Sequence, residues 1–228
     1  MRYGGLVTDR VRLGKMTNPV RGFLHGSAAV VSAAGMTLLI VRSAPDAARV
    51  VSMTIFGVSL IGLYSASALY HSVPWREKWK QRMQRLDHSM IFILVAGTYT
   101  PIAVNVLDGN WRTVTLAVVW GAAAVGIAQK IALPRVPDWV SIALQTTMGW
   151  FAIVPFLELV DALSNGAIAL MIAGGLSYTI GLILLANERP QLFPRIFSHH
   201  EVFHILVVMG SLFHFLMILW YVVPHSSL

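Results

Sequence analysis

The chain alternates long apolar segments with short polar ones. Seven of the apolar segments come close to the roughly 20 residues that an α-helix needs to cross the hydrocarbon core of a membrane. They cover residues 24–41, 51–71, 87–107, 112–132, 138–157, 167–186 and 200–223. The fifth is the weakest, because polar residues and Pro155 interrupt it. The pattern predicts an all-α membrane protein, with a basic tail of residues 1–23 followed by a single seven-transmembrane helix bundle over residues 24–228.

The composition agrees with this pattern. Of the 228 residues, 56% are hydrophobic and 12% are charged, whereas a soluble domain carries about 25% charged residues. The absence of cysteine excludes disulfides, thiolate metal sites and cysteine nucleophiles. All lysines stand in loops or at the ends of the apolar segments, which argues against the buried Schiff-base lysine of a retinal protein.

The positive charges are distributed unevenly between the two sides of the predicted bundle. The tail and the loop after the second segment each hold five Lys or Arg residues, and two further loops on that side hold two each. The opposite side holds only Arg42, Arg49 and Arg112. Because basic loops stay in the cytoplasm, we expect a cytoplasmic N-terminus and an outside C-terminus. The net charge of +7 therefore indicates membrane orientation, and we expect no nucleic-acid partner.

This orientation places several ionisable residues in one layer near the cytoplasmic surface. His71 lies at the end of the second segment, Asp87 in the predicted first turn of the third, and His200 and His204 at the start of the seventh. Ionisable groups inside a membrane usually face the bundle interior and mark functional sites. Three segments that are distant in the sequence thus bring polar groups to the same depth.

The spacing of His200 and His204 favours a metal site. Residues four apart share one face of a helix, so both imidazoles can bind one ion. His71 is the natural third ligand, which leaves a fourth position for water, as in catalytic zinc sites. A polar helix start at the membrane surface, or a haem held between histidine pairs, remains an alternative interpretation of the same residues.

Two oxygen-bearing residues extend the candidate site. Asp87 is either a base beside the metal or a helix-start residue that complements the macrodipole. Ser67 lies one turn before His71 on the same face. Its hydroxyl either bonds its own helix, which is common in membrane spans, or donates to a water or substrate oxygen at the metal.

The remaining histidines have simpler interpretations. We expect His199 to face the membrane interface and His88 to have a structural or loop-bonding role. His214 lies deeper and is expected to bond a neighbouring helix. His25 opens the first segment, where it either caps the helix or faces water, and His225 lies on the outer tail.

Four stretches carry a resemblance to a known family. NPVRGFLH at 18–25, YSASALYHS at 64–72, RLDHSMIFILVAGTYTP at 85–101 and HEVFHILVVMGSLFHF at 200–215 follow one another in the order found in the bacterial hemolysin III proteins. That family is a branch of the progestin and adipoQ receptor family, which includes the adiponectin receptors. The resemblance covers essentially the whole chain, and the combined Ser-x3-His, Asp and His-x3-His pattern is specific.

The resemblance implies a multi-pass protein of the bacterial inner (plasma) membrane, a seven-helix bundle with a cytoplasmic N-terminus. It implies a zinc ion held by His71, His200 and His204. It also implies that Asp87 contacts the zinc through water and that Ser67 lies close by. The family is similar to the alkaline ceramidases, which are membrane zinc amidases, and roles in membrane lipid homeostasis have been proposed for it.

Three functions fit this sequence, and the first two take membrane lipids as substrate or ligand. The first is a zinc-dependent, ceramidase-like hydrolase of a lipid amide or ester, with Asp87 as general base and Ser67 or the zinc stabilising the carbonyl oxygen. The second is a non-enzymatic lipid-homeostasis regulator or receptor with a structural zinc. The third is a pore-forming cytolysin, which gains little support because no predicted helix has a continuous polar stripe.

Overall fold

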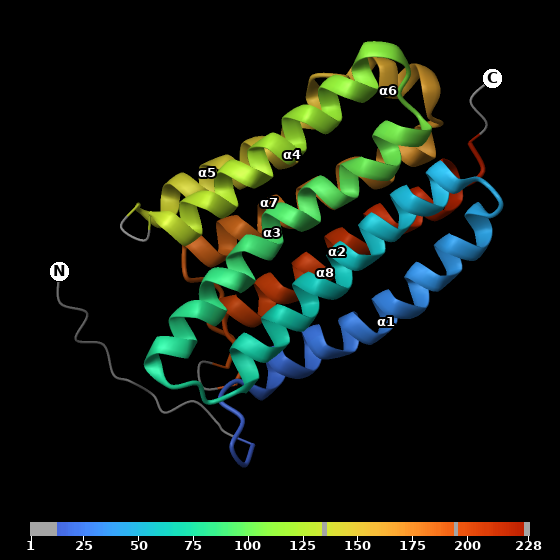
Figure 1. The fold of residues 1–228 in the computed structure, drawn as a ribbon. Helices are drawn as coiled ribbons and strands as arrows, with labels where there is room; N and C mark the ends of the chain where they lie inside the picture. Colours follow the sequence, from blue (N-terminus) through green and yellow to red (C-terminus); the bar gives the residue numbers. More distant parts are fainter. Residues whose placement is uncertain (1–12, 134–135, 194–195, 226–228) are drawn as a thin grey trace.

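The helices follow the apolar segments, because a backbone inside a membrane must satisfy its own hydrogen bonds. The computed structural model describes residues 13–133, 136–193 and 196–225. Within these ranges every regular element is a helix. In chain order they are α1 (Pro19–Ser43), α2 (Ala47–Ser72), α3 (Glu77–Asn105), α4 (Gly109–Ala132), α5 (Asp138–Gly149), η1 (Trp150–Ile153), α6 (Phe156–Ala162), α7 (Asn165–Ala186), α8 (His199–Met217) and η2 (Ile218–Val222) (Figure 1).

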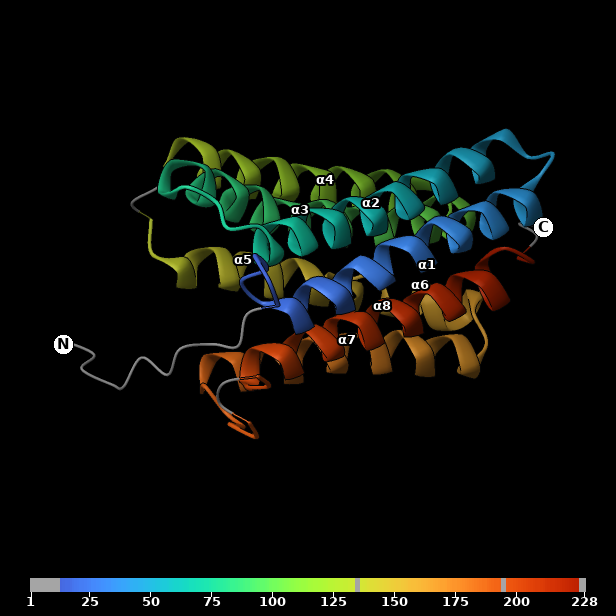
Figure 2. The ribbon, with the colours of Figure 1, turned by 90° about the horizontal axis from the view of Figure 1, so that it is seen from below.

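The helices form a bundle of membrane-spanning length. Six spans are long and apolar enough to cross a membrane: α1, α2, α3, α4, α7 and α8 together with η2. A seventh span results when α5, η1 and α6 are counted as one crossing, which is bent by 48°. The long helices run along a common direction in both views (Figure 1, Figure 2). The prediction of an all-α, seven-helix membrane protein is confirmed.

The break in the fifth span has a local cause. Pro155 has no N–H to donate and disfavours a continuous helix at this point. The freed backbone groups are partly satisfied by Tyr99 of α3, whose hydroxyl donates to the Gly149 carbonyl at 2.9 Å and accepts from the Ala152 N–H at 2.8 Å. The interrupted segment is thus held against α3 by a side chain instead of by its own helical bonds.

Helices α2 and α3 approach each other closely at a small residue. A Cβ added to Gly97 would lie only 2.3 Å from the Ser59 hydroxyl, so only glycine allows this separation. Small residues at such contacts are the usual means of tight packing between membrane helices. Large apolar residues are exposed on the outward faces instead, for example Val30 and Val31 on α1 and Val125 on α4.

The segment before α1 is bonded to the end of α2. The N–H groups of Thr17 and Asn18 donate to the carbonyls of Ser72 and His71, both at 3.1 Å, and the Thr17 hydroxyl donates to the His71 carbonyl at 2.7 Å. These bonds satisfy carbonyls that the last turn of a helix leaves without intrahelical partners. The start of α1 and the end of α2 are therefore fixed to each other at one end of the bundle.

One helix boundary differs from the sequence prediction in a way that matters for the site. α3 begins at Glu77, so Asp87 lies ten residues inside the helix and not in its first turn. The preceding segment is rich in Lys, Glu, Gln and Arg, which are good helix formers that hydropathy cannot place in a membrane span. The interpretation of Asp87 as a residue that complements the helix start is therefore wrong.

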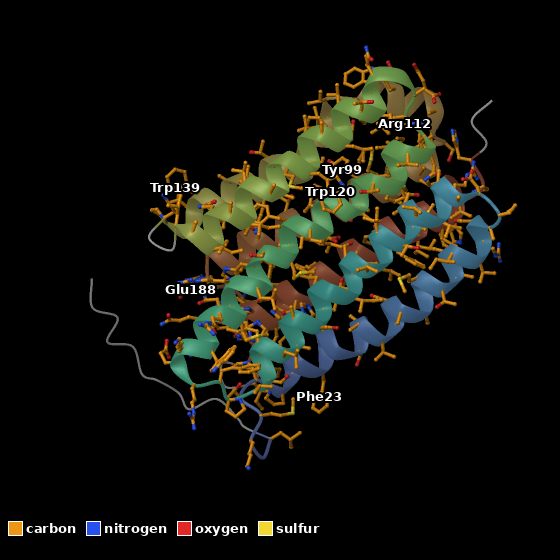
Figure 3. All side chains as sticks on the ribbon, viewed as in Figure 1. Phe23, Tyr99, Arg112, Trp120, Trp139 and Glu188 are labelled. Atoms are coloured by element: carbon orange, nitrogen blue, oxygen red, sulfur yellow. The ribbon has the colours of Figure 1, made fainter. Side chains whose placement is uncertain are left out.

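Exposed aromatic and charged side chains mark the ends of the bundle. Phe23 and Trp139 are 57% and 67% exposed and project at the end where α1 starts, whereas Arg112 lies at the other end (Figure 3). Aromatic residues concentrate at membrane–water interfaces. The end that carries the start of α1 is the one that the distribution of basic residues predicts to be cytoplasmic.

The predicted orientation can be measured by cysteine labelling, because the chain contains no cysteine of its own. We expect Ala44→Cys, which is exposed between α1 and α2, to react with a membrane-impermeant maleimide on intact cells. Gln84→Cys, which is exposed on α3, should react only after the membrane is opened. The reverse labelling pattern would contradict a cytoplasmic N-terminus.

Candidate metal centre

Three histidines from two helices converge at one end of the bundle. His71 comes from the last turn of α2, and His200 and His204 come from the first turns of α8. One ring nitrogen of each lies within 4.8 Å of the corresponding nitrogens of the other two. Their ring centroids are 4.8 to 5.2 Å apart. His71 and His204 are buried, while His200 is half-buried. The structure thus brings together the three residues that the sequence singles out.

The start of α8 is fixed by a capping box. The Glu201 carboxylate accepts hydrogen bonds from the Ser198 N–H and the Ser198 hydroxyl, both at 2.7 Å. The Ser198 side chain in turn accepts from the backbone N–H of Glu201, and such a capping box satisfies donors that a helix start leaves unpaired. Because the helix begins at His199, His200 and His204 stand on its first and second turns with their side chains on the same face.

A buried ion pair joins α1 to the same capping box. The Arg21 Nε donates to the second Glu201 oxygen at 2.6 Å, and the two side chains are only 7% and 3% exposed. Glu201 therefore interacts both with its own helix start and with α1. From the sequence alone, Arg21 is one of the five basic residues of the N-terminal tail. Its position four residues before His25, on the same helix face, is the signal that could have indicated a role at the site.

Asp87 and Ser67 form a second buried polar pair, between α2 and α3. The Ser67 hydroxyl interacts with the Asp87 carboxylate, and both side chains are buried, at 3% and 8% exposure. Ser67 lies one helical turn before His71 on α2. α3 therefore brings a carboxylate to the helix face that carries a proposed ligand. The catalytic roles predicted for the two residues remain predictions.

The donor set fits a divalent transition metal. Zinc binds imidazole nitrogen at about 2.0–2.1 Å, so tetrahedral ligands lie about 3.3 Å apart. The three nitrogens lie within 4.8 Å of one another, so small side-chain rotations would bring them to that separation. His204 has a buried Nδ1 atom with no hydrogen-bond partner among the described residues, so that atom forms no bond that would compete with an ion. Imidazole accepts several first-row metals, so the donors are consistent with zinc without selecting it.

The structure also places the other histidines. His25 is buried at 3% exposure and its ring stacks on that of His204, with centroids 4.0 Å apart. The prediction that His25 caps a helix or faces water is wrong, because the face of α1 that carries it packs against α8. His214 was expected to bond a neighbouring helix, and its Nε2 atom lies 3.2 Å from the Met171 carbonyl of α7. His199 lies outside the cluster, with its Nδ1 atom 2.9 Å from the Gln191 amide nitrogen.

Comparison with known proteins agrees with these features. The family model described as Haemolysin-III related matches residues 14–215. The chain belongs to the hemolysin III family. It is 34% identical over 205 residues to "Hemolysin-3" of Bacillus cereus, covering 89% of this chain and 90% of that protein. It is also 34% identical over 201 residues to "Hemolysin-3 homolog" of Bacillus subtilis (strain 168), covering 87% and 91% respectively.

Membership in the hemolysin III family makes the chain an integral membrane protein, in agreement with its apolar helices. The matched region begins before α1 and ends within α8. It therefore contains the histidine cluster together with Asp87 and Ser67.

The convergence of the three histidines predicts their effect on metal content. Replacing His204 by Ala removes one of three ligands, so we expect metal affinity to fall by more than the roughly 10–100-fold that is typical for residues behind a ligand. Metal content by mass spectrometry, and affinity by chelator competition, would measure the change. The matched control is His199→Ala, which should keep wild-type affinity; equal affinity of both variants would contradict the three-histidine site.

The Arg21–Glu201 pair makes a separate prediction about stability. Removing one partner of a buried ion pair costs about 3–5 kcal/mol, so Arg21→Gln should markedly lower the thermal midpoint of the purified, metal-free protein. Asp108→Asn is the control, because it breaks the exposed pair with Arg112, which is worth at most about 1 kcal/mol. Similar midpoints for the two variants would show that the pair contributes little.

Proposed function

We propose that this hemolysin III protein is a zinc-dependent hydrolase that cleaves an amide or ester bond of a membrane lipid. The observation that carries the proposal is the combination of three converging imidazoles with the buried Asp87 carboxylate, which interacts with Ser67 one helical turn before His71. Three neutral nitrogen ligands with one open position are typical of catalytic zinc, whereas structural zinc sites usually have four protein ligands.

Each residue has a distinct part in such a reaction. His71, His200 and His204 would hold the ion. When bound, zinc lowers the pKa of a coordinated water towards about 7 and polarises a carbonyl group. The Asp87 carboxylate accepts a proton from the attacking water and returns it to the leaving amine or alkoxide, as general bases and acids do. The single proton of the Ser67 hydroxyl orients Asp87 in the resting protein and would turn to the developing oxyanion once Asp87 has taken up the proton of the water.

The depth of the cluster supports a lipid as the substrate. The histidines lie within the terminal turns of α2 and α8, so the cluster is near one membrane surface and not at the midplane. The ester and amide groups of lipids lie at the same level, where the acyl chains meet the headgroups. A lipid that enters sideways between helices could therefore present its carbonyl to the site without leaving the bilayer.

A structural role for the metal is the second candidate. α2 packs mainly against α1 and α3, whereas α8 packs mainly against α7. An ion held by His71 of α2 and the two histidines of α8 would connect these two groups of helices. In this case the protein would be a non-enzymatic regulator or receptor of membrane lipids. Chelation would then loosen the bundle, and no lipid would be cleaved at any metal loading.

Replacing Asp87 by Asn tests the hydrolase. We expect the variant to retain its metal, because Asp87 lies outside the three-histidine group, and to lose about 10²–10⁴-fold in turnover, as is usual for a general base. The assay measures fatty-acid release from ceramide and from diacylglycerol esters by the zinc-loaded protein in lipid nanodiscs. Asp161→Asn, on the exposed face of α6, is the control and should keep wild-type turnover.

Two results would contradict this function. Zinc-loaded wild type that cleaves neither lipid class, but whose thermal midpoint falls on chelation, would favour the structural role. Turnover by Asp87→Asn equal to that of wild type would assign the proton transfer to another group.

A further inference from the structure

His25 lies directly behind one of the proposed metal ligands. It follows Arg21 by one helical turn on α1, and the two residues make parallel contacts with α8. Arg21 pairs with Glu201, while His25 stacks on His204 one turn further along that helix. Both contacts lie in the buried interior of the bundle. The ion pair therefore sets the register in which the two imidazoles meet.

The stacking geometry shows that His25 is not a further ligand of the same ion. The two rings are nearly parallel, with centroids 4.0 Å apart and planes inclined by 23°. A metal lies close to the plane of each imidazole that binds it. Planes so nearly parallel do not meet within a metal–nitrogen bond length of about 2.0–2.1 Å. His25 is accordingly not part of the convergent group of three.

The same geometry restricts the orientation of His204. Carbon atoms in contact lie about 3.5–4.0 Å apart, so the His25 ring occupies the space that His204 would sweep if it turned about its Cβ–Cγ bond. His25 is itself held in place, because its ring packs edge-on against Tyr64 of α2 at 5.0 Å. Helices α1 and α2 thus supply a wall against the face of a ligand on α8.

The polar atoms of these residues form a second feature. The Nδ1 atom of His204 and both ring nitrogens of His25 are buried, and they form no hydrogen bond of ordinary geometry among the described residues, although the His25 ring interacts with the His204 backbone. Such groups are rarely left unsatisfied in a protein interior. A histidine that binds metal normally uses its second nitrogen in a hydrogen bond that fixes the ring and its tautomer. Because the two rings are stacked, their in-plane nitrogens do not bond each other directly, but one buried water at the edge of the stack would bridge the His25 ring to that nitrogen.

We propose that His25 is a positioning residue of the metal centre. Its ring holds His204 in the ligating orientation by face-to-face packing, and its nitrogens hold a water that bonds the second nitrogen of His204. The inference rests on the metal binding of the proposed function and deepens it, but it does not depend on lipid cleavage. It assigns α1 a part in a site whose proposed ligands come from α2 and α8.

Cobalt substitution tests this role without an activity assay. Co²⁺ replaces zinc in such sites, and its visible absorption reports ligand number and geometry. We expect His25→Ala to weaken Co²⁺ affinity by about 10–100-fold, as is typical for residues behind a ligand, and to broaden the absorption bands. His25→Phe keeps a ring against His204 without nitrogens, so its bands should stay close to wild type while its affinity falls to an intermediate value.

The control is His214→Ala, which removes another imidazole from α8 at a site bonded to α7, and it should leave Co²⁺ affinity and spectrum unchanged. Thermal midpoints of the metal-free proteins separate positioning from general stability. Wild-type affinity and spectrum in His25→Ala would overturn the proposal. An equal loss of Co²⁺ affinity in His214→Ala and in the His25 variants, with an equal fall in thermal midpoint, would also overturn it. A spectrum showing one ligand fewer in His25→Ala would make His25 a ligand, which also overturns it. If wild type binds neither Co²⁺ nor Zn²⁺, the proposed function fails first.

Discussion

The arrangement of the candidate centre depends on the buried contact between Arg21 and Glu201. Two charges that leave water must be paired and fully hydrogen-bonded, or their desolvation destabilises the fold. Here one carboxylate receives the guanidinium of α1, the backbone of its own helix start and the Ser198 hydroxyl. That requirement fixes where α8 begins and how α1 lies against it. The positions of His200, His204 and His25 follow from those two facts.

Hydrophobicity alone was sufficient to predict the fold class, because a membrane allows few backbone solutions and a helical span needs a continuous apolar segment. The convergence of His71, His200 and His204 was also predictable. The i,i+4 spacing selects one face of α8, and the depth inferred from orientation selects a partner on α2. Both arguments use only helix geometry and chain direction, which a single sequence contains.

Two features were beyond the reach of the sequence, for different reasons. The partner of a helix face is not encoded in its periodicity, so the approach of α1 to α8, and with it the stacking of His25 on His204, needed the three-dimensional packing. The start of α3 was misplaced because hydropathy detects where a helix enters the hydrocarbon and not where it begins. Asp87 therefore lies further inside the helix, and is more buried, than a residue of the first turn would be.

The broken fifth span gives the bundle unequal stiffness. α5 contacts α3 and α4, away from the helices that carry the histidines, and its bend at Pro155 is held by one tyrosine hydroxyl. A bilayer that thickens or thins must be matched by tilting or bending of spans at modest cost. A span already broken yields more easily than continuous helices whose ends are bonded to one another. Mechanical stress from the lipid would thus be absorbed away from α2 and α8, where the three histidines converge.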